Sequence, residues 1–323
     1  MYYLAYGSKG ESSFPLPELQ EITTDSPQLN WTFRVLPPLE TPISDYSWFH
    51  SWIHEDGTTW FACTKQAQDY VLRFPEFADF VISADGEQID CAPWPNVPDE
   101  TIRHLFLDQI LPRILSQREG VVLHGSAVVI GGGGVVFMGE SGQGKSTLAV
   151  SLSRKGFPML TDDGLYVTQK DQLLCYPSYP GVRLWSESVS ELYQGSSALP
   201  FVAHYSDKQR LDATQGALPF AASPVPLRAI YLLVSEPTHQ GKDAEIWPAR
   251  GQEAFREVAK GLHRLDVTNR SELLHQFELV SKVVAAVPTY KLYFRHDFSL
   301  LPLTIQTILN HLDSVEMMGE QSD

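Results

Sequence analysis

The sequence predicts an α/β fold in two parts, with a smaller β-rich N-terminal domain and a larger C-terminal domain. Aromatic and β-branched residues recur in short runs over the first hundred residues, whereas apolar strand patterns alternate with helical patterns after residue 120. A glycine-rich turn at 139–146 joins one apolar run to a helical pattern. The 323 residues are enough for about two domains, each with its own core.

Residues 1–98 are predicted to form the β-rich domain, because their apolar runs are short and are broken by proline, glycine and acidic turns. The predicted strands are 2–6, 31–36, 48–54, 58–64, 70–74 and 80–83. A proline-rich segment, 93–98, ends this part of the chain. Residues 99–120 then form a linking helix, since apolar side chains recur there at spacings of three and four.

Residues 121–323 are predicted to form the second domain, in which buried strands alternate with helices. The runs at 121–130 and 135–138 are joined by Gly131 to Gly134, as in a hairpin. Further strands are expected near 158–160, 165–168, 173–176, 228–234, 244–247 and 289–294, and helices near 145–155, 186–193, 252–262, 271–284 and 301–312. The segment 195–226 has no clear pattern, which is typical of a lid or a docking loop.

The composition disfavours several classes of function. With 24 Lys and Arg against 39 Asp and Glu, the formal charge is −15, so neither nucleic acid nor an anionic membrane is an expected partner. No apolar stretch is long enough to span a membrane, and the N-terminus lacks a signal-peptide pattern. Cys63, Cys91 and Cys175 are widely spaced, which indicates buried thiols in a reducing, cytoplasmic protein.

Residues 139–146, GESGQGKS, match the phosphate-binding pattern G-x-x-x-x-G-K-[ST] between a strand and a helix. The glycines allow successive backbone N–H groups to turn toward phosphate oxygens, and the helix N-terminus adds partial positive charge. Lys145 is expected to reach the β- and γ-phosphates of ATP, and the Ser146 hydroxyl to ligate Mg²⁺. The alternative is a glycine turn with no ligand.

Asp162 and Asp163 follow the next apolar run, so they are expected to emerge at the same sheet edge as the phosphates. One carboxylate would hold Mg²⁺, and the other would accept a proton from an attacking hydroxyl. An irregular strand end is needed for both to face the site. The alternative is a solvated turn, because Asp-Asp-Gly also favours turns.

Two further side chains are candidates. His124 lies on the strand that precedes the glycine hairpin, where it is either a catalytic residue or a satisfied core histidine. Arg183 follows a proline-glycine turn, where it either clamps phosphate or stacks on Trp185.

The order His-Gly strand, hairpin, G-x-S-G-x-G-K-S loop, helix and paired aspartates over 124–167 resembles the catalytic domain of HPr kinase/phosphorylase. The resemblance implies a P-loop fold of that family, an acceptor serine, Asp163 as general base with Asp162 near the metal, and His124 as the active-site histidine. The nucleotide and its metal would be held by Gly139, Ser141, Gly142, Gln143, Gly144, Lys145, Ser146, Thr147 and Arg183, with Ser146 and Asp162 as the metal ligands.

The segments AYGSKGESSFPLPEL, VLRFPEFADFVIS, LHGSAVV and YPGVRLW are similar to the HPr-kinase-like branch that includes lasso peptide kinases. This likeness implies phosphorylation of a serine on a ribosomal precursor peptide, with ATP and Mg²⁺. Two features depart from HPr kinase/phosphorylase, because Thr147 replaces an acidic residue and the Glu-Arg-Gly-Leu-Gly signature is missing. The reverse, phosphorolytic activity is therefore not carried over.

The sequence thus predicts a serine kinase that acts on a peptide or protein. A kinase of an HPr-like protein, a kinase of a small hydroxyl compound and a nucleotide-gated regulatory ATPase remain alternatives, because a phosphate-binding loop with paired carboxylates serves each of them. Lys208 and Arg210, in the segment 195–226, are expected to meet an acidic or C-terminal carboxylate of the acceptor. The oligomeric state is left open, with a homo-oligomer among the expectations.

Overall fold

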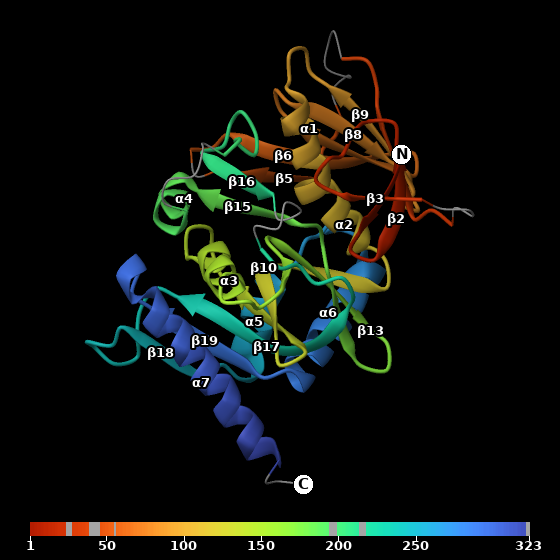
Figure 1. The fold of residues 1–323 in the computed structure, drawn as a ribbon. Helices are drawn as coiled ribbons and strands as arrows, with labels where there is room; N and C mark the ends of the chain where they lie inside the picture. Colours follow the sequence, from red (N-terminus) through yellow and green to blue (C-terminus); the bar gives the residue numbers. More distant parts are fainter. Residues whose placement is uncertain (24–27, 39–45, 55, 194–198, 213–217, 321–323) are drawn as a thin grey trace.

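The protein is described by a computed structural model that covers residues 1–323 except 24–27, 39–45, 55, 194–198, 213–217 and 321–323. Two large sheets form the framework of the structure (Figure 1), and the α/β fold class expected from the sequence is confirmed. The first sheet is built by the N-terminal third of the chain, and the second carries the glycine-rich turn. No helix of the described chain has the length and hydrophobicity needed to cross a membrane.

The N-terminal sheet has nine strands in the order β3-β1-β2-β4-β9-β8-β7-β6-β5. The strands are β1 (Tyr2–Ala5), β2 (Ser8–Ser12), β3 (Gln20–Ile22), β4 (Trp31–Val35), β5 (His50–Ile53), β6 (Thr59–Gln66), β7 (Asp69–Phe74), β8 (Ala78–Ile82) and β9 (Gln88–Pro93). All six predicted strands exist with small shifts at their ends. The sequence analysis missed β2, β3 and β9, which carry polar residues at positions where aliphatic strand residues were sought.

The predicted linking helix is divided into three parts: α1 (Asp99–Leu105), a π-helical turn η1 (Phe106–Ile110) and α2 (Leu111–Leu115). Pro112 has no backbone N–H and restricts the preceding backbone, so the helical hydrogen bonds change spacing just before it, and Leu111 N donates to Phe106 O. The apolar side chains of this segment are buried together with those of the N-terminal sheet, so the segment belongs to that core.

The second sheet has eight strands, most of them in the order β11-β10-β13-β14-β17-β19-β18. They are β10 (Gly120–Ile130), β11 (Gly133–Met138), β12 (Met159–Thr161), β13 (Gly164–Gln169), β14 (Leu173–Tyr176), β17 (Val225–Val234), β18 (Ala244–Pro248) and β19 (Thr289–Phe294). The predicted β10–β11 hairpin is confirmed, with positive φ at Gly131 and Gly132. Because β11 also pairs in parallel with β17, the glycine-rich turn after β11 lies at the end of a central strand.

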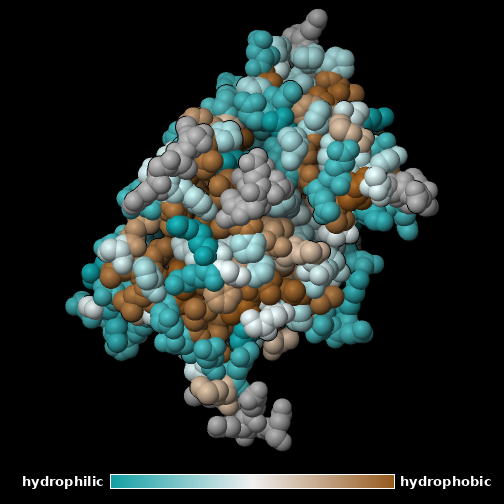
Figure 2. Space-filling model, in the orientation of Figure 1, coloured by the Kyte–Doolittle hydropathy of each residue, from teal (hydrophilic) through white to brown (hydrophobic). Residues whose placement is uncertain are grey.

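Helices cover both faces of this sheet. The helices are α3 (Lys145–Ser153), α4 (Ser186–Leu192), α5 (Gly251–Lys260), α6 (Arg270–Ala286) and α7 (Leu301–Glu320), with a 3-10 turn η3 (Phe298–Leu300) before α7. One apolar core lies beneath α3 and α7, and another lies beneath α5 and α6. On the face shown in Figure 2, hydrophobic residues gather over the lower half of the molecule, where Figure 1 shows β17 and β19.

The segment 195–226 was expected to lack regular structure, and this expectation is wrong for its central part. β16 (Lys208–Asp212) pairs with β15 (Gly181–Trp185) in a separate two-stranded ribbon, and Arg183 is the register partner of Arg210. Residues 194–198 and 213–217 of that segment lie outside the described residues. Tyr205 packs against Trp60 and Phe77, so the chain leading into β16 contacts the N-terminal sheet.

Candidate active site

The glycine-rich turn connects Met138, the last residue of β11, with Lys145, the first residue of α3. Gly142 and Gly144 have φ values of +84° and +88°, a region that side chains with a Cβ rarely adopt. A Cβ on Gly144 would also lie 2.8 Å from the Phe294 ring. Since no side chain caps α3 in the described structure, the first N–H groups of the helix are available to an anion.

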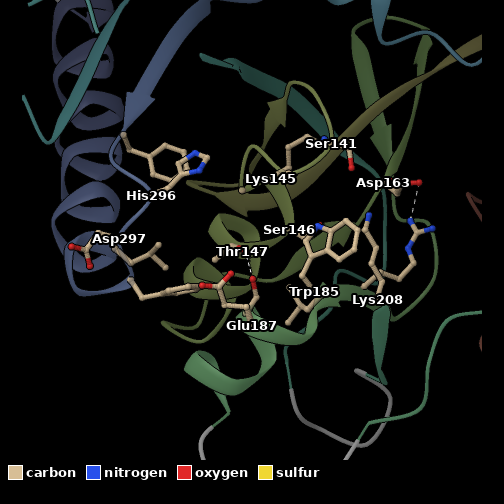
Figure 3. Close-up of a pocket in the computed structure, with 18 of the residues that line it drawn as sticks. Ser141, Lys145, Ser146, Thr147, Asp163, Trp185, Glu187, Lys208, His296 and Asp297 are labelled. Carbon is tan, nitrogen blue, oxygen red and sulfur yellow. Dashed lines mark hydrogen bonds and ion pairs between the residues drawn. The ribbon is translucent and has the colours of Figure 1, made fainter. Parts of the chain in front are cut away.

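A cavity of about 260 Å³ opens in front of this turn (Figure 3). Predicted site residues that line it are His124, Ser141, Gly142, Gly144, Lys145, Ser146, Thr147, Asp163 and Arg183. Trp185, Lys208 and His296 close the cavity from the β15–β16 ribbon and from the loop after β19. The structure therefore brings most of the predicted site to one cavity.

Lys145 is buried, and its Nζ donates hydrogen bonds to the carbonyl oxygens of Gly139 and Glu140, each at 2.9 Å. Burial lowers the pKa of the ammonium group, with Asp163 opposing that effect. The lysine is thus folded against the loop from which it would reach a phosphate.

Two predicted loop residues lie on the other side of the turn. Gly139 and Gln143 line a second cavity, and Gln143 Oε1 accepts a hydrogen bond of 2.8 Å from Glu140 N. Gln143 therefore braces the loop, whereas direct contact with a nucleotide by its side chain remains a prediction. Thr147, on α3, exchanges a hydrogen bond of 3.2 Å with Ser188 of α4.

Asp163 occupies the turn between β12 and β13, with a φ of +99°. Its carboxylate lies 3.0 Å from Nη2 of Arg183 and 3.4 Å from Nδ1 of His124. Although burial acts to raise the pKa of Asp163, Arg183 and then His124 hold it well below its usual range. The group is therefore ionised at neutral pH and faces the cavity with the phosphate-binding loop.

Asp162 does not share this position, which corrects the expectation that both carboxylates face one site. Its Oδ1 accepts a hydrogen bond from Ser126 Oγ at 2.7 Å, and its Oδ2 accepts one from Arg183 N at 2.8 Å. The side chain is buried and does not line the cavity. Successive side chains of a strand point to opposite faces. Asp162, directly after β12, keeps this alternation, whereas the irregular turn begins only at Asp163.

Arg183 is buried in β15 and binds two carboxylates. Its Nη1 lies 2.6 Å from Oδ2 of Asp108, and its Nη2 bridges Asp163 and the carbonyl oxygen of Asp162. The alternative, stacking of Arg183 on Trp185, is not what the structure records, because the cation over that ring is Lys208, at 5.3 Å. Arg183 lines the cavity but has its charge matched by aspartates.

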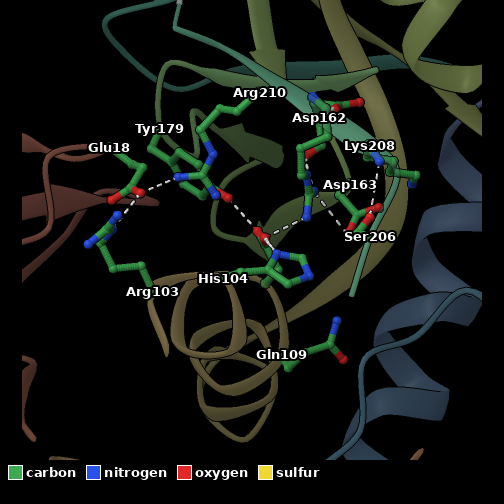
Figure 4. Close-up of polar contacts among 12 residues, drawn as sticks. Glu18, Arg103, His104, Gln109, Asp162, Asp163, Tyr179, Ser206, Lys208 and Arg210 are labelled. Carbon is green, nitrogen blue, oxygen red and sulfur yellow. Dashed lines mark hydrogen bonds and ion pairs between the residues drawn. The ribbon is translucent and has the colours of Figure 1, made fainter. Parts of the chain in front are cut away.

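Asp108 lies on η1 and connects this site with the linking helix through Arg183. Figure 4 shows its neighbours His104 and Tyr179. Asp108 also contacts His104 Nδ1 at 2.5 Å and the hydroxyl of Tyr179. Burial opposes ionisation, but Arg183 and His104 lower the pKa of Asp108 to about 2. Nearby, Arg210 and Arg103 both pair with Glu18, so Arg210 is not free to meet an acceptor carboxylate as expected.

His124 lies at the mouth of both cavities and is half-buried. Asp163 raises the pKa of the imidazole, but burial together with Lys145 and Arg183 outweighs it, and the net shift is downward. The ring is therefore neutral at pH 7. The interpretation as a fully satisfied core histidine does not hold.

The donors in the cavity fit a magnesium ion that is shared with phosphate. The Ser146 hydroxyl and the Asp163 carboxylate both line it, and Mg²⁺ prefers oxygen donors from one or two carboxylates completed by phosphate and water. Within the described residues no group of three or more His, Cys, Asp or Glu is arranged to hold a metal. Such an ion would therefore depend on the phosphates of the nucleotide.

The sequence analysis did not identify several residues that line the cavity. Phe294, His296 and Asp297 lie at and just after the end of β19, 150 residues beyond the loop that they face, and no local pattern indicates this contact. Asp108, a polar residue of the predicted linking helix that binds Arg183, was not among the candidate site residues. The polar residue inside an otherwise apolar helical face was the single available signal.

Part of the chain is similar to known proteins. Residues 115–180 match the family model described as "HPr Serine kinase C-terminal domain". This segment of the chain is HPr-kinase-like. It contains β10, the phosphate-binding loop, α3 and the Asp162–Asp163 turn.

Curated relatives match part of the chain. The chain is 33% identical over 107 residues to the HPr kinase/phosphorylase of Lactobacillus johnsonii, which covers 30% of this chain and 33% of that protein. It is 37% identical over 91 residues to that of Xylella fastidiosa, 28% of each chain. The match thus spans about a third of the length of these relatives. A solved structure of Hpr(Ser) kinase/phosphatase from Coxiella burnetii aligns with 15% identity and a TM-score of 0.37, over 62% of this chain and 94% of that one.

Proposed function

We propose that this protein is an ATP- and Mg²⁺-dependent serine kinase that transfers the γ-phosphate to a hydroxyl of a peptide or protein. The observation that carries the proposal is the single cavity lined by the phosphate-binding loop and by Asp163. The match of residues 115–180 to the HPr kinase family adds support. A ribosomal precursor peptide of the lasso type is the proposed acceptor, on the sequence resemblance given above.

In this proposal the loop at 139–146 and the α3 N-terminus hold the triphosphate, and Ser146 helps to bind Mg²⁺, which neutralises charge on the β- and γ-oxygens. Lys145 leaves the carbonyl oxygens of Gly139 and Glu140 to contact phosphate. The apolar side of the cavity, with Phe294 and Phe298, suits a nucleoside base.

Asp163 is the residue that orients the acceptor. Because Arg183 keeps its carboxylate ionised, it accepts a hydrogen bond from the hydroxyl and aligns the oxygen with the γ-phosphorus. A low pKa makes it a weak proton acceptor, which suits a loose transition state in which the proton leaves late. Asp162 is assigned a structural role, because both of its oxygens are hydrogen-bonded inside the protein.

The test is transfer of labelled γ-phosphate, followed by mass spectrometry of candidate peptides. Asp163→Asn is expected to retain nucleotide binding but to lower transfer about 10²-fold or more, and Lys145→Ala to abolish turnover. The matched control is Asp171→Asn, an exposed carboxylate in the turn after β13, which should behave as wild type. Transfer to water alone would assign a regulatory ATPase instead.

A further inference from the structure

A second cavity, of about 910 Å³, lies on the far side of the phosphate-binding loop. Its walls come from β5 with Trp52, from α2 with Arg113, from the loop with Glu140, and from the chain after α5 with His263 and Arg264. The N-terminal sheet and the second sheet thus both contribute to it. Its volume is large enough for several residues of a peptide.

The two cavities meet at His124, which lines both. The His124 ring lies 3.4 Å from Asp163 on one side and 5.9 Å from the His263 ring on the other. A group that enters through the second cavity therefore lies beside Asp163, the carboxylate proposed to orient the acceptor. The nucleotide would occupy the first cavity. In-line transfer needs the acceptor and the leaving group on opposite sides of the γ-phosphorus, which matches two cavities that meet at one point.

The charged residues of the second cavity leave an unbalanced positive charge. Arg256 and Lys260 pair with Glu257, and Lys291 pairs with Glu253. Arg113 and Arg264 are different, because no carboxylate lies within 4 Å of either among the residues that the structure describes. In a chain of net charge −15, two such cations in one cavity need an explanation.

Arg113 is the deeper of the two and is almost fully buried. Its Nη1 donates to Gln109 O at 2.6 Å, and its guanidinium lies 4.5 Å from the Phe61 ring centre. Its Nε has no hydrogen-bond partner in the described chain. Burial lowers the pKa of Arg113 to about 10, as expected of a cation without a counter-ion.

Two neighbouring side chains also have a nitrogen without a hydrogen-bond partner, although Arg264 Nη2 donates to Ala259 O at 3.0 Å. His263 Nε2 and Arg264 Nε are also buried and make no hydrogen bond with the described residues. Burial lowers the pKa of His263 to about 3, so the imidazole is neutral and available for a hydrogen bond with a hydroxyl or a carboxylate. Three unpartnered nitrogens in the lining of one cavity indicate a polar, anionic ligand, because buried polar groups are otherwise satisfied.

We propose that the second cavity is the acceptor subsite, and that Arg113, assisted by Arg264, binds a carboxylate of the peptide whose serine enters beside His124. This inference rests on the proposed kinase function and adds the acceptor's chemistry to it. A planar guanidinium matches a carboxylate or a phosphate group. The carboxylate is favoured because the phosphates already have a binding loop with its own lysine in the other cavity.

The test uses a small acceptor, acetyl-Ser-Gly-Gly, with a free terminal carboxylate or as its amide. Calorimetric titration in the presence of ADP and Mg²⁺ should show the acid binding to wild type at least about 10-fold more tightly than the amide, the usual scale of a charged hydrogen bond. In Arg113→Gln the two forms should bind equally. Arg250→Gln, an exposed arginine outside the cavity, is the matched control and should keep the difference.

A purely structural role for Arg113 predicts a different effect of Arg113→Gln on the Tm and on the acid–amide difference. Since no carboxylate pairs with its buried charge among the described residues, Arg113→Gln should leave the Tm of the ligand-free protein unchanged or raised. A fall of several degrees with the acid–amide difference intact would overturn the assignment. If that variant does not fold, Arg113→Lys and Arg264→Gln provide the same comparison, with a reduced difference expected in each.

Failure of the subsite and failure of the kinase proposal are distinguishable. Lys145→Ala should lose nucleotide turnover but keep the acid–amide difference. If wild type binds the acid selectively yet transfers no phosphate, the kinase proposal fails and the subsite stands. Equal binding of acid and amide, or Arg113-dependent binding of inorganic phosphate with no effect of the carboxylate, would overturn the acceptor subsite.

Discussion

At the scale of single residues, Asp162 and Asp163 are neighbours in sequence but have different surroundings. Asp163 faces the loop cavity and pairs with Arg183, whereas Asp162 accepts hydrogen bonds from Ser126 and from the backbone of Arg183. The sequence identified the pair but not the different roles of its two members, because the two carboxylates differ only in which buried donors they contact. Those donors lie 36 and 21 residues from Asp162 along the chain.

Replacing Asp162 by alanine should therefore lower stability more than it lowers nucleotide affinity. The variant leaves Ser126 Oγ and Arg183 N without an acceptor, which costs about 1–3 kcal/mol of unfolding free energy. Urea unfolding measures this loss, and titration with Mg²⁺ and ADP measures affinity. Unchanged stability with a large loss of Mg²⁺ affinity would restore Asp162 as a metal ligand.

The pairing of Asp108 predicts a pH dependence of stability. In the folded chain its pKa is lowered from the ordinary carboxyl range to about 2, despite burial, because Arg183 and His104 favour the charged form. A lowered carboxyl pKa gives stabilisation that is present above about pH 4 and is lost as the pH falls through 2. The stability gap between wild type and Asp108→Asn should therefore narrow as the pH is lowered from 5 toward 2.

Chemical unfolding of both proteins at pH 5, 4 and 3 measures that gap, with Asp171→Asn as an exposed reference. A gap that stays constant or widens at low pH would mean that Asp108 is not held ionised by Arg183.

At the scale of elements, two glycines of the phosphate-binding loop allow the effect of backbone strain to be measured apart from that of steric contact. Gly142 and Gly144 both have positive φ, but a Cβ on Gly142 would meet nothing within 4 Å, whereas one on Gly144 would meet Phe294. Gly142→Ala should introduce only the free-energy cost of a Cβ at positive φ, about 1 kcal/mol. Gly144→Ala should lose more affinity for Mg²⁺-ADP, and Phe294→Leu in the same chain should restore part of it.

Titration of the three variants with Mg²⁺-ADP provides the comparison, with Tm measured in parallel to show that the fold persists. Equal losses for the two glycines would mean that Phe294 yields without cost and does not shape the loop.

The elements that sequence analysis found and missed differ in a physical way. The strand–loop–helix around 139–146 was predicted correctly because local chemistry specifies it, with glycines at positive φ and an apolar strand before them. The strand β16 was missed because its sequence, KQRLD, has no apolar alternation, and it forms by pairing with β15. The contacts of Arg183 with Asp108, and of Arg113 with the second cavity, join segments that no local pattern connects.

At the scale of the whole molecule, the predicted boundary between a linking helix and a kinase domain can be tested by truncation. The apolar residues of α1, η1 and α2 are buried in the N-terminal core, which also includes Val122, Tyr166 and Leu265 from beyond the boundary. Asp108, on η1, pairs with Arg183. A fragment of residues 121–323 is therefore expected to lose cooperative unfolding and nucleotide binding.

Scanning calorimetry and near-UV circular dichroism of that fragment, beside the full chain, check this expectation. A sharp thermal transition together with full affinity for Mg²⁺-ADP would show that the second sheet folds alone and that residues 1–120 are an appended module.

The position of Lys145 has a consequence for the proposed binding of ATP. Its ammonium group already holds two carbonyl oxygens of the loop, at 2.9 Å each. When a triphosphate binds, the amine exchanges these two neutral carbonyl oxygens for charged phosphate oxygens. The gain in binding free energy is only the difference between the two interactions, so the lost carbonyl contacts lower the net affinity. Selectivity follows from the same exchange, because an oxygen with little charge cannot compete for the amine, whereas a doubly charged terminal phosphate can.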